Sequence, residues 1–431
     1  MNRYTLLAAL WLSVTGYAQQ TSFSFCFDGN KKDEKALQIT KQQVFSEQTG
    51  YGYDLQSAPD LKANKPFYFS VAVPDGNYRV TVTLGSKKSA GVTTVRAESR
   101  RLFIENLPTR KGEFVQQSFV VNKRNTEIAP GEYVKIKVRE KSKLNWDNKL
   151  TLEFNGDAPL LSALTIERVS DVPTIFLCGN STVVDQDNEP WASWGQMIPH
   201  FFGTDVCIAN YAESGESANT FIGAKRLAKA LSQIKKGDYL FMEFGHNDQK
   251  IDTLDAFGGY TENLKYFVNF VREKGANPII CSPINRIIFQ EDGTLLNLLG
   301  DYRTAVKNVC DEMNVPFIDL WSCTTEFFEA AGAVKAWDYF WGNGTDRDYT
   351  HTNDIGGNIV ARFVANEMIK NNVQPIADLI KKDMINVEMP KHDSSVKPQN
   401  SKEIEHLKTI GLVNVPKASE LADLDKDITN I

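Results

Sequence analysis

The stretch TIFLCGNSTVV, residues 174–184, decides the fold prediction for the second half of this 431-residue chain. Its apolar first half is typical of a strand buried on both faces, and the Gly-Asn-Ser-Thr sequence that follows is typical of a turn. Apolar runs of the same kind recur at 206–210, 239–244, 277–282 and 315–319, and helical segments separate them at 191–202, 221–234, 261–274, 300–313 and 355–371. This alternation predicts an α/β domain over residues 173–374, a parallel sheet whose active site lies at the carboxyl ends of its strands.

The region before this domain follows a different period. Apolar and polar residues alternate at 67–73, 78–84 and 133–138, and Pro-Asp-Gly-Asn and Pro-Gly turns follow or precede these runs. Further strands are predicted at 117–121, 149–154 and 164–169. The period of two predicts an all-β antiparallel sandwich over residues 22–170. The polar, lysine-rich C-terminal extension at 375–431 shows only weak helical patterns, and its structure is left open.

The first 18 residues have the features of a secretory signal peptide. Arg3 precedes an apolar run at 6–14, and the small residues Gly16 and Ala18 follow it. The run is much shorter than the ~20 residues that span a bilayer, so no membrane insertion is expected. We expect export to the periplasm or the medium. The net charge of −6 provides no basic surface for nucleic acid, and no feature specifies an oligomeric state.

Ser181 directly follows the first apolar strand and precedes a helical segment. A serine at a strand-to-helix turn exposes its hydroxyl near the positive end of a helix, where a backbone N–H can bind an oxyanion. A serine in such a turn is more often a simple helix cap, so this position needs chemical partners before it indicates catalysis.

Asp348 and His351 supply a candidate acid–base pair. An aspartate three residues before a histidine can accept from Nδ1 and leave Nε2 free to take a proton from a serine. The alternative is a turn aspartate followed by a surface histidine. His246 is a competing base, but no carboxylate precedes it at this spacing.

Two further positions after strands can donate hydrogen bonds to an oxyanion. Asn247, within FGHND at 244–248, can offer its side-chain amide, and Gly215 lets a substrate oxygen approach its backbone N–H. Each residue is also common in ordinary turns. The joint placement of Ser181, Gly215, Asn247, Asp348 and His351 after strands is what favours an active site.

The order and spacing of these residues resemble blocks I, II, III and V of the SGNH (GDSL-type) hydrolases. Within that superfamily the sequence most resembles the rhamnogalacturonan acetylesterases of carbohydrate esterase family 12. This likeness covers about residues 173–371 and rests on GNSTV at 179–183, WGQMIP at 194–199, KGDY at 236–239, FGHND at 244–248 and DYTH at 348–351. The resemblance implies a flavodoxin-like three-layer α/β/α fold, and residues 22–170 resemble a galactose-binding-like sandwich that could bind carbohydrate.

The same resemblance implies the role of each residue. Ser181 is the expected nucleophile, Asp348 and His351 complete the triad, and Ser181, Gly215 and Asn247 are the expected oxyanion donors. Two positions depart from the family pattern. Asn180 stands where members usually have Asp, which keeps an acceptor oxygen for local N–H groups but removes the charge. Glu216 stands where members commonly have Arg, and this concerns substrate contacts more than chemistry.

The implied reaction is removal of acetyl groups from rhamnogalacturonan through an acyl-enzyme, with no metal or cofactor. Trp337 and Trp341, in a Gly-rich stretch before Asp348, are candidates for stacking on sugar rings, whereas Trp191 and Trp194 are expected in the core. The motifs do not separate this substrate from acetylxylan, another glycan or a small ester. A noncatalytic carbohydrate-binding protein is a second alternative, for which Asn180 is the only hint. A lipase would be expected to carry a larger apolar lid segment.

Overall fold

The computed structural model describes residues 20–28, 34–60, 64–342 and 347–391. The predicted signal peptide and residues 392–431 of the C-terminal extension lie outside these ranges. Within the ranges that are described, no helix is both long enough and apolar enough to cross a membrane.

The predicted parallel sheet is confirmed. It consists of β13 (Thr174–Gly179), β14 (Cys207–Asn210), β15 (Tyr239–Glu243), β16 (Asn277–Cys281) and β17 (Phe317–Ile318). All neighbouring pairs are parallel, and their order is β17-β16-β15-β13-β14. This is the strand order of flavodoxin-like folds, in which ligands bind where the chain changes direction across the sheet, beside the first strand. Ser181 follows that first strand, β13.

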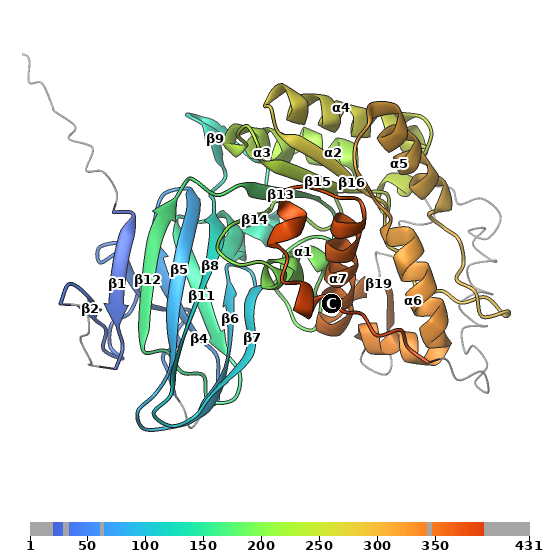
Figure 1. The fold of residues 1–431 in the computed structure, drawn as a ribbon. Coiled ribbons are helices and arrows are strands. Elements are labelled where there is room, and N and C mark those ends of the chain that lie inside the picture. The colour runs from blue at the N-terminus through green and yellow to red at the C-terminus, as the bar shows by residue number, and fades with distance from the viewer. Residues whose placement is uncertain (1–19, 29–33, 61–63, 343–346, 392–431) are drawn as a thin grey trace, which may run out of the picture.

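Helices cover both faces of this sheet (Figure 1). On β13, Ile175 and Leu177 face one core, while Phe176 and Cys178 face the other. The first core also contains side chains of α1 (Trp194–Met197), η3 (Ile198–Phe201), α6 (Leu320–Lys335), η6 (Ala336–Tyr339) and α7 (Asp354–Lys370), and the second those of α2 (Ala218–Gly223), α3 (Arg226–Gln233), α4 (Gly259–Glu273) and α5 (Gly300–Met313). The domain is therefore a three-layer α/β/α structure.

The region before β13 forms two facing sheets around a separate apolar core. One sheet contains β8 (Phe114–Lys123), β5 (Gly76–Gly85), β12 (Ala163–Val169), β1 (Ser22–Cys26) and β2 (Leu37–Gln38), and the other β3 (Tyr51–Asp54), β4 (Phe67–Ala72), β11 (Lys149–Asn155), β6 (Gly91–Ala97) and β7 (Arg101–Thr109). The alternation of buried and partly exposed residues along β5 is the pattern of such a sandwich. The likeness to a galactose-binding-like domain stays a prediction.

The sandwich and the α/β region share one continuous sheet. Val121 of β8 pairs with Ile208 of β14, so ten strands form a single mixed sheet. The fully buried Arg101 lies at this junction, where its guanidinium donates to the carbonyl oxygens of Ile208 and Asn122 at 3.4 and 3.0 Å. Figure 1 shows the sandwich on one side of the molecule and the helix-covered sheet on the other.

One predicted strand, at 133–138, is wrong. The strand β10 contains only Glu132–Tyr133 and pairs with β9 (Glu127–Ala129), and a 3-10 helix, η1 (Val138–Ser142), follows, with η2 (Leu144–Trp146) behind it. Val138, expected to face a core, is 83% exposed. The cationic side chains of this segment bind a distant loop, described below, and those contacts replace strand pairing.

Other differences concern helices. The predicted helix at 221–234 is divided into α2 and α3 at Lys225, which has a φ of 61°. The helix α6 was not predicted, and Gly332 within it has a non-helical φ of 72°. Residues 375–391 are not a separate polar tail. They form η7 (Ile376–Leu379) and η8 (Lys382–Met384), and buried isoleucines in and beside these two helices pack into the core with α7.

Candidate active site

Ser181 lies in a tight turn that Asn180 organises. The Asn180 carbonyl accepts from the N–H groups of Val183 and Val184 at 3.1 and 3.0 Å. Its side-chain oxygen accepts from the Thr182 N–H at 3.0 Å and from the Thr182 hydroxyl at 2.8 Å. Asn180 therefore keeps the local acceptor role expected of it. Ser181 is 8% exposed, at the carboxyl end of β13.

The expected helix directly after Ser181 is absent. The first helix of the domain, α1, begins at Trp194, so Ser181 is not at the N-terminus of the helix that follows it in the sequence. Residues 186–191 between them form a partly exposed loop, and the Arg100 guanidinium holds it through the carbonyl oxygens of Gln186 and Trp191 at 3.3 and 2.9 Å. Backbone N–H groups must then supply the electrostatic help at Ser181.

Asp348 and His351 lie on one strand of a hairpin, β18 (Phe340–Gly342) and β19 (Arg347–Thr352). The Asp348 Oδ2 lies 2.7 Å from His351 Nδ1, and His351 Nε2 lies 2.7 Å from Ser181 Oγ. Asp348 Oδ1 accepts from the N–H groups of Thr350 and His351, both at 2.9 Å. The structure thus joins the three predicted triad residues in one chain of hydrogen bonds.

The environment keeps the Asp348 carboxylate charged. Asp348 is fully buried, and burial alone raises a carboxyl pKa. The charge and hydrogen bond of His351, together with the two backbone donors, outweigh burial and hold the pKa of Asp348 below its ordinary value. A charged acceptor at Nδ1 fixes the proton there and leaves Nε2 to accept from Ser181.

His246, the competing base, forms no hydrogen bond with Ser181, whose hydroxyl is paired with His351. It is 1% exposed, and burial, followed by the charges of Arg286 and His351, lowers its pKa well below the ordinary value. His246 is therefore neutral and remains inside the loop after β15. The geometry selects His351 as the base.

Two of the three predicted oxyanion donors, Gly215 and Asn247, lie on adjacent loops. The Glu213 N–H donates to the Gly179 carbonyl at 3.2 Å, so the loop at 213–217 begins beside the end of β13. The Asn247 side-chain amide donates to the Glu216 carbonyl at 3.0 Å, which brings the loop after β15 to the same place. Among the residues that the structure describes, neither the Ser181 N–H nor the Gly215 N–H donates to a protein acceptor. These donors remain available to an incoming oxygen.

Sequence reasoning missed two residues beside Asn247. Asp248 accepts from the Ala218 and Gly245 N–H groups, both at 2.8 Å, and so ties the two oxyanion loops together. Lys250, in η4 (Asp248–Lys250), donates to the Asn247 side-chain oxygen at 3.2 Å. Burial, aided by the charge of Arg286, lowers the pKa of Lys250 to about 7. Only one indication of their roles is present in the sequence, which is that Asp248 follows Asn247 in the FGHND stretch and Lys250 lies two residues further on.

A buried carboxyl group lies beneath the Ser181 turn. Glu243, the last residue of β15, is fully buried and contacts the Thr182 hydroxyl at 2.7 Å and the indole N–H of Trp194. Burial raises the pKa of Glu243 to about 7. Trp194 is 1% exposed, so its expected place in the core is confirmed.

The candidate sugar-stacking tryptophans lie on or beside the hairpin that carries the acid and base. Trp337, in η6, packs edge-on against Tyr349, and the Arg347 guanidinium lies 4.6 Å from its ring centre. Trp341, in β18, is stacked on Trp191 with ring centres 5.0 Å apart. Both candidates are only partly buried, but each already has one ring contact within the protein. Their role toward substrate stays a prediction.

Glu216, at the position where arginine was expected by resemblance, is turned into an ion-pair cluster. It is 2% exposed, and its carboxylate lies 2.7 Å from the Lys137 amine and 3.7 Å from the Arg226 guanidinium. Its charge is therefore compensated by the protein. Within the described part of the chain, no group of three or more His, Cys, Asp or Glu side chains is arranged to hold a metal ion.

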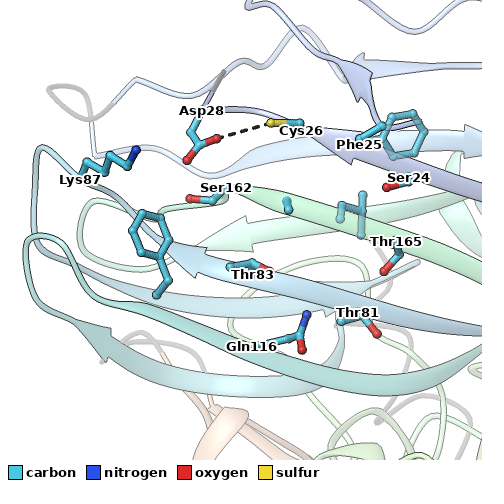
Figure 2. Close-up of a pocket in the computed structure, with 14 residues that line it drawn as sticks. Ser24, Phe25, Cys26, Asp28, Thr81, Thr83, Lys87, Gln116, Ser162 and Thr165 are labelled. Carbon is cyan, nitrogen blue, oxygen red and sulfur yellow. Dashed lines mark hydrogen bonds between the residues drawn. The ribbon is translucent and has the colours of Figure 1, made fainter. Parts of the chain in front are cut away.

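A hollow of about 650 Å³ lies on the outer face of the sandwich. Figure 2 shows Thr81, Thr83 and Thr165 on neighbouring strands along its floor, with Gln116 beside them and Lys87 at one end. On β5 these threonines alternate with buried valines, so the hollow presents the polar side of the sheet. Hydroxyl and amide groups of this kind can exchange hydrogen bonds with sugar hydroxyls.

A flavodoxin-like sheet with a serine after its first strand, joined by hydrogen bonds to a histidine and an aspartate, is typical of the serine hydrolases of the SGNH type. Comparison with known proteins then identifies the family. The model of the GDSL-like lipase/acylhydrolase family matches residues 177–358.

Three curated relatives are similar to the chain. Rhamnogalacturonan acetylesterase RhgT of Bacillus subtilis (strain 168) is 35% identical over 215 residues, which are 47% of this chain and 92% of the relative. The probable rhamnogalacturonan acetylesterase YesY of the same organism is 34% identical over 214 residues, 48% of this chain and 98% of the relative. The uncharacterized esterase YxiM, also from that organism, is 26% identical over 315 residues, 71% of this chain and 75% of the relative. The chain therefore belongs to the GDSL-like lipase/acylhydrolase family and is a carboxylic ester hydrolase.

Proposed function

We propose that the protein is a serine esterase that removes acetyl groups from rhamnogalacturonan, the substrate named for two of its relatives. The observation that carries the proposal is the chain of two 2.7 Å contacts from Asp348 through His351 to Ser181. This arrangement lets a neutral imidazole take the serine proton while a charged carboxylate stabilises the resulting imidazolium.

The reaction proceeds in two steps. Ser181 Oγ forms a bond to the acetyl carbon as its proton moves to His351 Nε2, and the carbonyl oxygen becomes an oxyanion. The N–H groups of Ser181 and Gly215 and the Asn247 amide stabilise this oxyanion. The bond to the sugar oxygen then breaks, and that oxygen takes the proton from His351. Water attacks the acetyl-serine in the same way, which returns the proton to Ser181 and releases acetate.

The test is acetate release from acetylated rhamnogalacturonan and acetylated xylan, compared for the full chain and Ser181→Ala. We expect release from the pectic substrate and a loss of at least about 10⁴-fold in the variant. Release from xylan alone would replace the substrate and keep the mechanism. No release from either polymer or from aryl acetates would instead support the noncatalytic carbohydrate-binding alternative.

The proposal assigns the polysaccharide a second contact, in the hollow of the sandwich (Figure 2). Its exposed Gln116 and Lys87 can donate hydrogen bonds to sugar hydroxyls without touching the triad. We expect Gln116→Ala/Lys87→Ala to weaken binding of the acetylated polymer in calorimetry and to leave aryl acetate hydrolysis unchanged. Unchanged polymer binding would remove this part of the proposal.

The proposal also includes export, because residues 1–18 have the charge and apolar pattern of a signal peptide. We expect the protein recovered from the periplasm or medium to begin near Gln19. Mass spectrometry of its N-terminus tests this, and an intact Arg3 in the recovered protein would contradict it.

A further inference from the structure

The loop at 213–217 is held from outside the catalytic domain. The Lys137 amine donates to the Ser214 carbonyl oxygen at 2.6 Å, and the Arg139 guanidinium donates to the same oxygen at 2.5 Å. Arg139 also pairs with the Glu213 carboxylate at 3.1 Å. Both cations come from the segment that joins β10 to β11, outside residues 177–358 that match the family.

The Ser214 carbonyl belongs to the same peptide group as the Gly215 N–H. In a trans peptide the C=O and N–H point in opposite directions, so two cations on the oxygen fix the direction of the N–H. Their charge also polarises the group and makes its N–H a stronger donor. Gly215 has a φ of +75°, and glycine tolerates both orientations of the preceding peptide. The cations therefore select one orientation of a peptide that is otherwise free to turn over.

Burial and charge explain why this contact is strong. The side chains of Glu213 and Glu216 are each only 2% exposed, and their carboxylates need cations nearby. Lys143 supplies one more, at 2.9 Å from the Glu213 carboxylate. The cations lie over these carboxylates at the surface, where the Lys137 and Arg139 side chains are 33% and 47% exposed.

The segment that carries the cations is itself anchored in the catalytic domain. Glu140, fully buried, accepts from the Arg226 guanidinium and from the Trp146 indole N–H, both at 3.0 Å. Arg226 is the first residue of α3, which follows the loop at 213–217 and α2 in the sequence. The anchor holds Lys137 and Arg139 in place, so they act as a fixed clamp and not as mobile surface side chains.

We propose that Lys137 and Arg139 are positioning residues that orient the Ser214–Gly215 peptide so that its N–H stabilises the oxyanion. This inference rests on the proposed esterase function and deepens it, because it makes the sandwich region part of the active centre. Loss of the clamp leaves substrate binding intact and weakens an interaction made mainly in the transition state.

The test uses the full chain with Lys137→Met/Arg139→Gln, the charge-conserving exchange Lys137→Arg/Arg139→Lys, and Lys141→Met as a matched control. Lys141 is exposed on η1, the 3-10 helix that also carries Arg139, and among the described residues it forms no hydrogen bond or ion pair with the loop at 213–217. Two rates are measured, turnover of p-nitrophenyl acetate and modification of Ser181 by a p-nitrophenyl phosphonate. In the second, Ser181 Oγ bonds to phosphorus, p-nitrophenolate leaves, and the phosphoryl oxygen occupies the oxyanion site.

We expect the double neutral variant to lose about tenfold in kcat with KM within twofold, and to be phosphonylated about tenfold more slowly. Both rates of the charge-conserving variant should stay within about threefold of the wild-type rates. Both rates of Lys141→Met should equal the wild-type rates. A double variant with wild-type kcat, or one whose slower turnover is not accompanied by slower phosphonylation, overturns the inference. A wild-type chain that neither hydrolyses the acetate nor reacts with the phosphonate overturns the proposed function itself, and the clamp with it.

Discussion

Asp348 and His351 reach each other within one strand, three residues apart, whereas Gly215 and Asn247 come from separate loops that other parts of the chain hold in place. The acid and the base are joined within this one strand, which two hydrogen bonds between Thr352 and Ala192 also tie to the loop before α1. The oxyanion side needs Asp248 between the two loops, and it needs Arg139 and Lys137, which lie 75 and 77 residues before Ser214 in the sequence.

Because of this difference, we expect activity to respond differently to substitutions on the two sides of the site. A change on the acid–base side removes a proton acceptor that no neighbour replaces, because His246 is neutral and forms no hydrogen bond with Ser181. A change on the oxyanion side removes one of several donors or supports, and the remaining ones still act. Activity should therefore fall abruptly on the first side and in steps on the second.

The largest effect is expected for Asp348→Asn. The amide can place its N–H₂ against Nδ1, which puts the proton on Nε2 and prevents it from accepting the Ser181 proton. We expect kcat for an aryl acetate to fall about 10⁴-fold with little change in Tm. Asp354→Asn, six residues further along with its side chain 44% exposed, is the matched control and should stay within twofold of the wild type. A kcat for Asp348→Asn within tenfold of the wild type would mean that proton transfer from Ser181 does not depend on the charge of Asp348.

How far the sequence predicted the site follows from the same difference. Ser181, Asp348 and His351 were predictable because a strand buried on both faces, a turn and a three-residue spacing are local patterns. The segment at 133–138 was misread because its alternation fits a strand equally well. What decides its structure is the pairing of Lys137 and Arg139 with a loop far along the chain, which no local pattern contains.

Two features of the fold were hidden for the same reason. The single pair Val121–Ile208 that merges the two sheets depends on the register of strands far apart in sequence. Asp248 lies in a motif that was recognised, yet its role depends on the Ala218 N–H at the start of α2, 30 residues away. Local sequence patterns therefore identify the catalytic residues, whereas the contacts that hold these residues in place join parts of the chain that are far apart in sequence.

The next effect in size is expected for Asn247→Ala. Loss of one side-chain donor to the oxyanion should lower kcat by about 10²–10³-fold and leave KM nearly unchanged. Asn247→Asp sharpens this test, since the carboxylate keeps the shape but donates no hydrogen bond and repels the oxyanion. It should lose at least as much activity as the alanine variant. If the aspartate variant retains activity, the Asn247 amide is not an oxyanion donor.

A smaller step is expected for Lys250→Met. Lys250 donates to the Asn247 side-chain oxygen and so keeps the amide nitrogen toward the site, and without it the amide can rotate. We expect kcat to fall about tenfold and Tm to stay the same or rise, because methionine removes an amine that burial holds at a pKa of about 7. Lys236→Met, at an exposed turn, is the control for the loss of charge. A fall in Tm that parallels the fall in kcat would assign Lys250 to stability alone.

The smallest effect on activity, within about threefold, is expected for Glu243→Gln. Glu243 lies beneath the Ser181 turn, where it contacts the Thr182 hydroxyl. Its main effect is on the pH dependence of stability. Burial raises the pKa of Glu243 from 4.5 to about 7, so the folded protein keeps a proton that the unfolded chain loses as the pH rises through this window. The wild type therefore loses stability from pH 4.5 to 7, and the glutamine variant lacks this loss.

Urea titrations at pH 4.5, 5.5, 6.5 and 7.5 measure the free energy of unfolding of both proteins. The variant minus wild-type difference should rise across the window by on the order of 1–3 kcal/mol and become level above pH 7. Other buried carboxyl groups, such as Asp248 with a pKa of about 6, titrate in both proteins and cancel in the difference. A difference that does not vary with pH would mean that Glu243 is charged beneath the serine, and the turn that presents Ser181 would then rest on a buried carboxylate and not on a neutral acid.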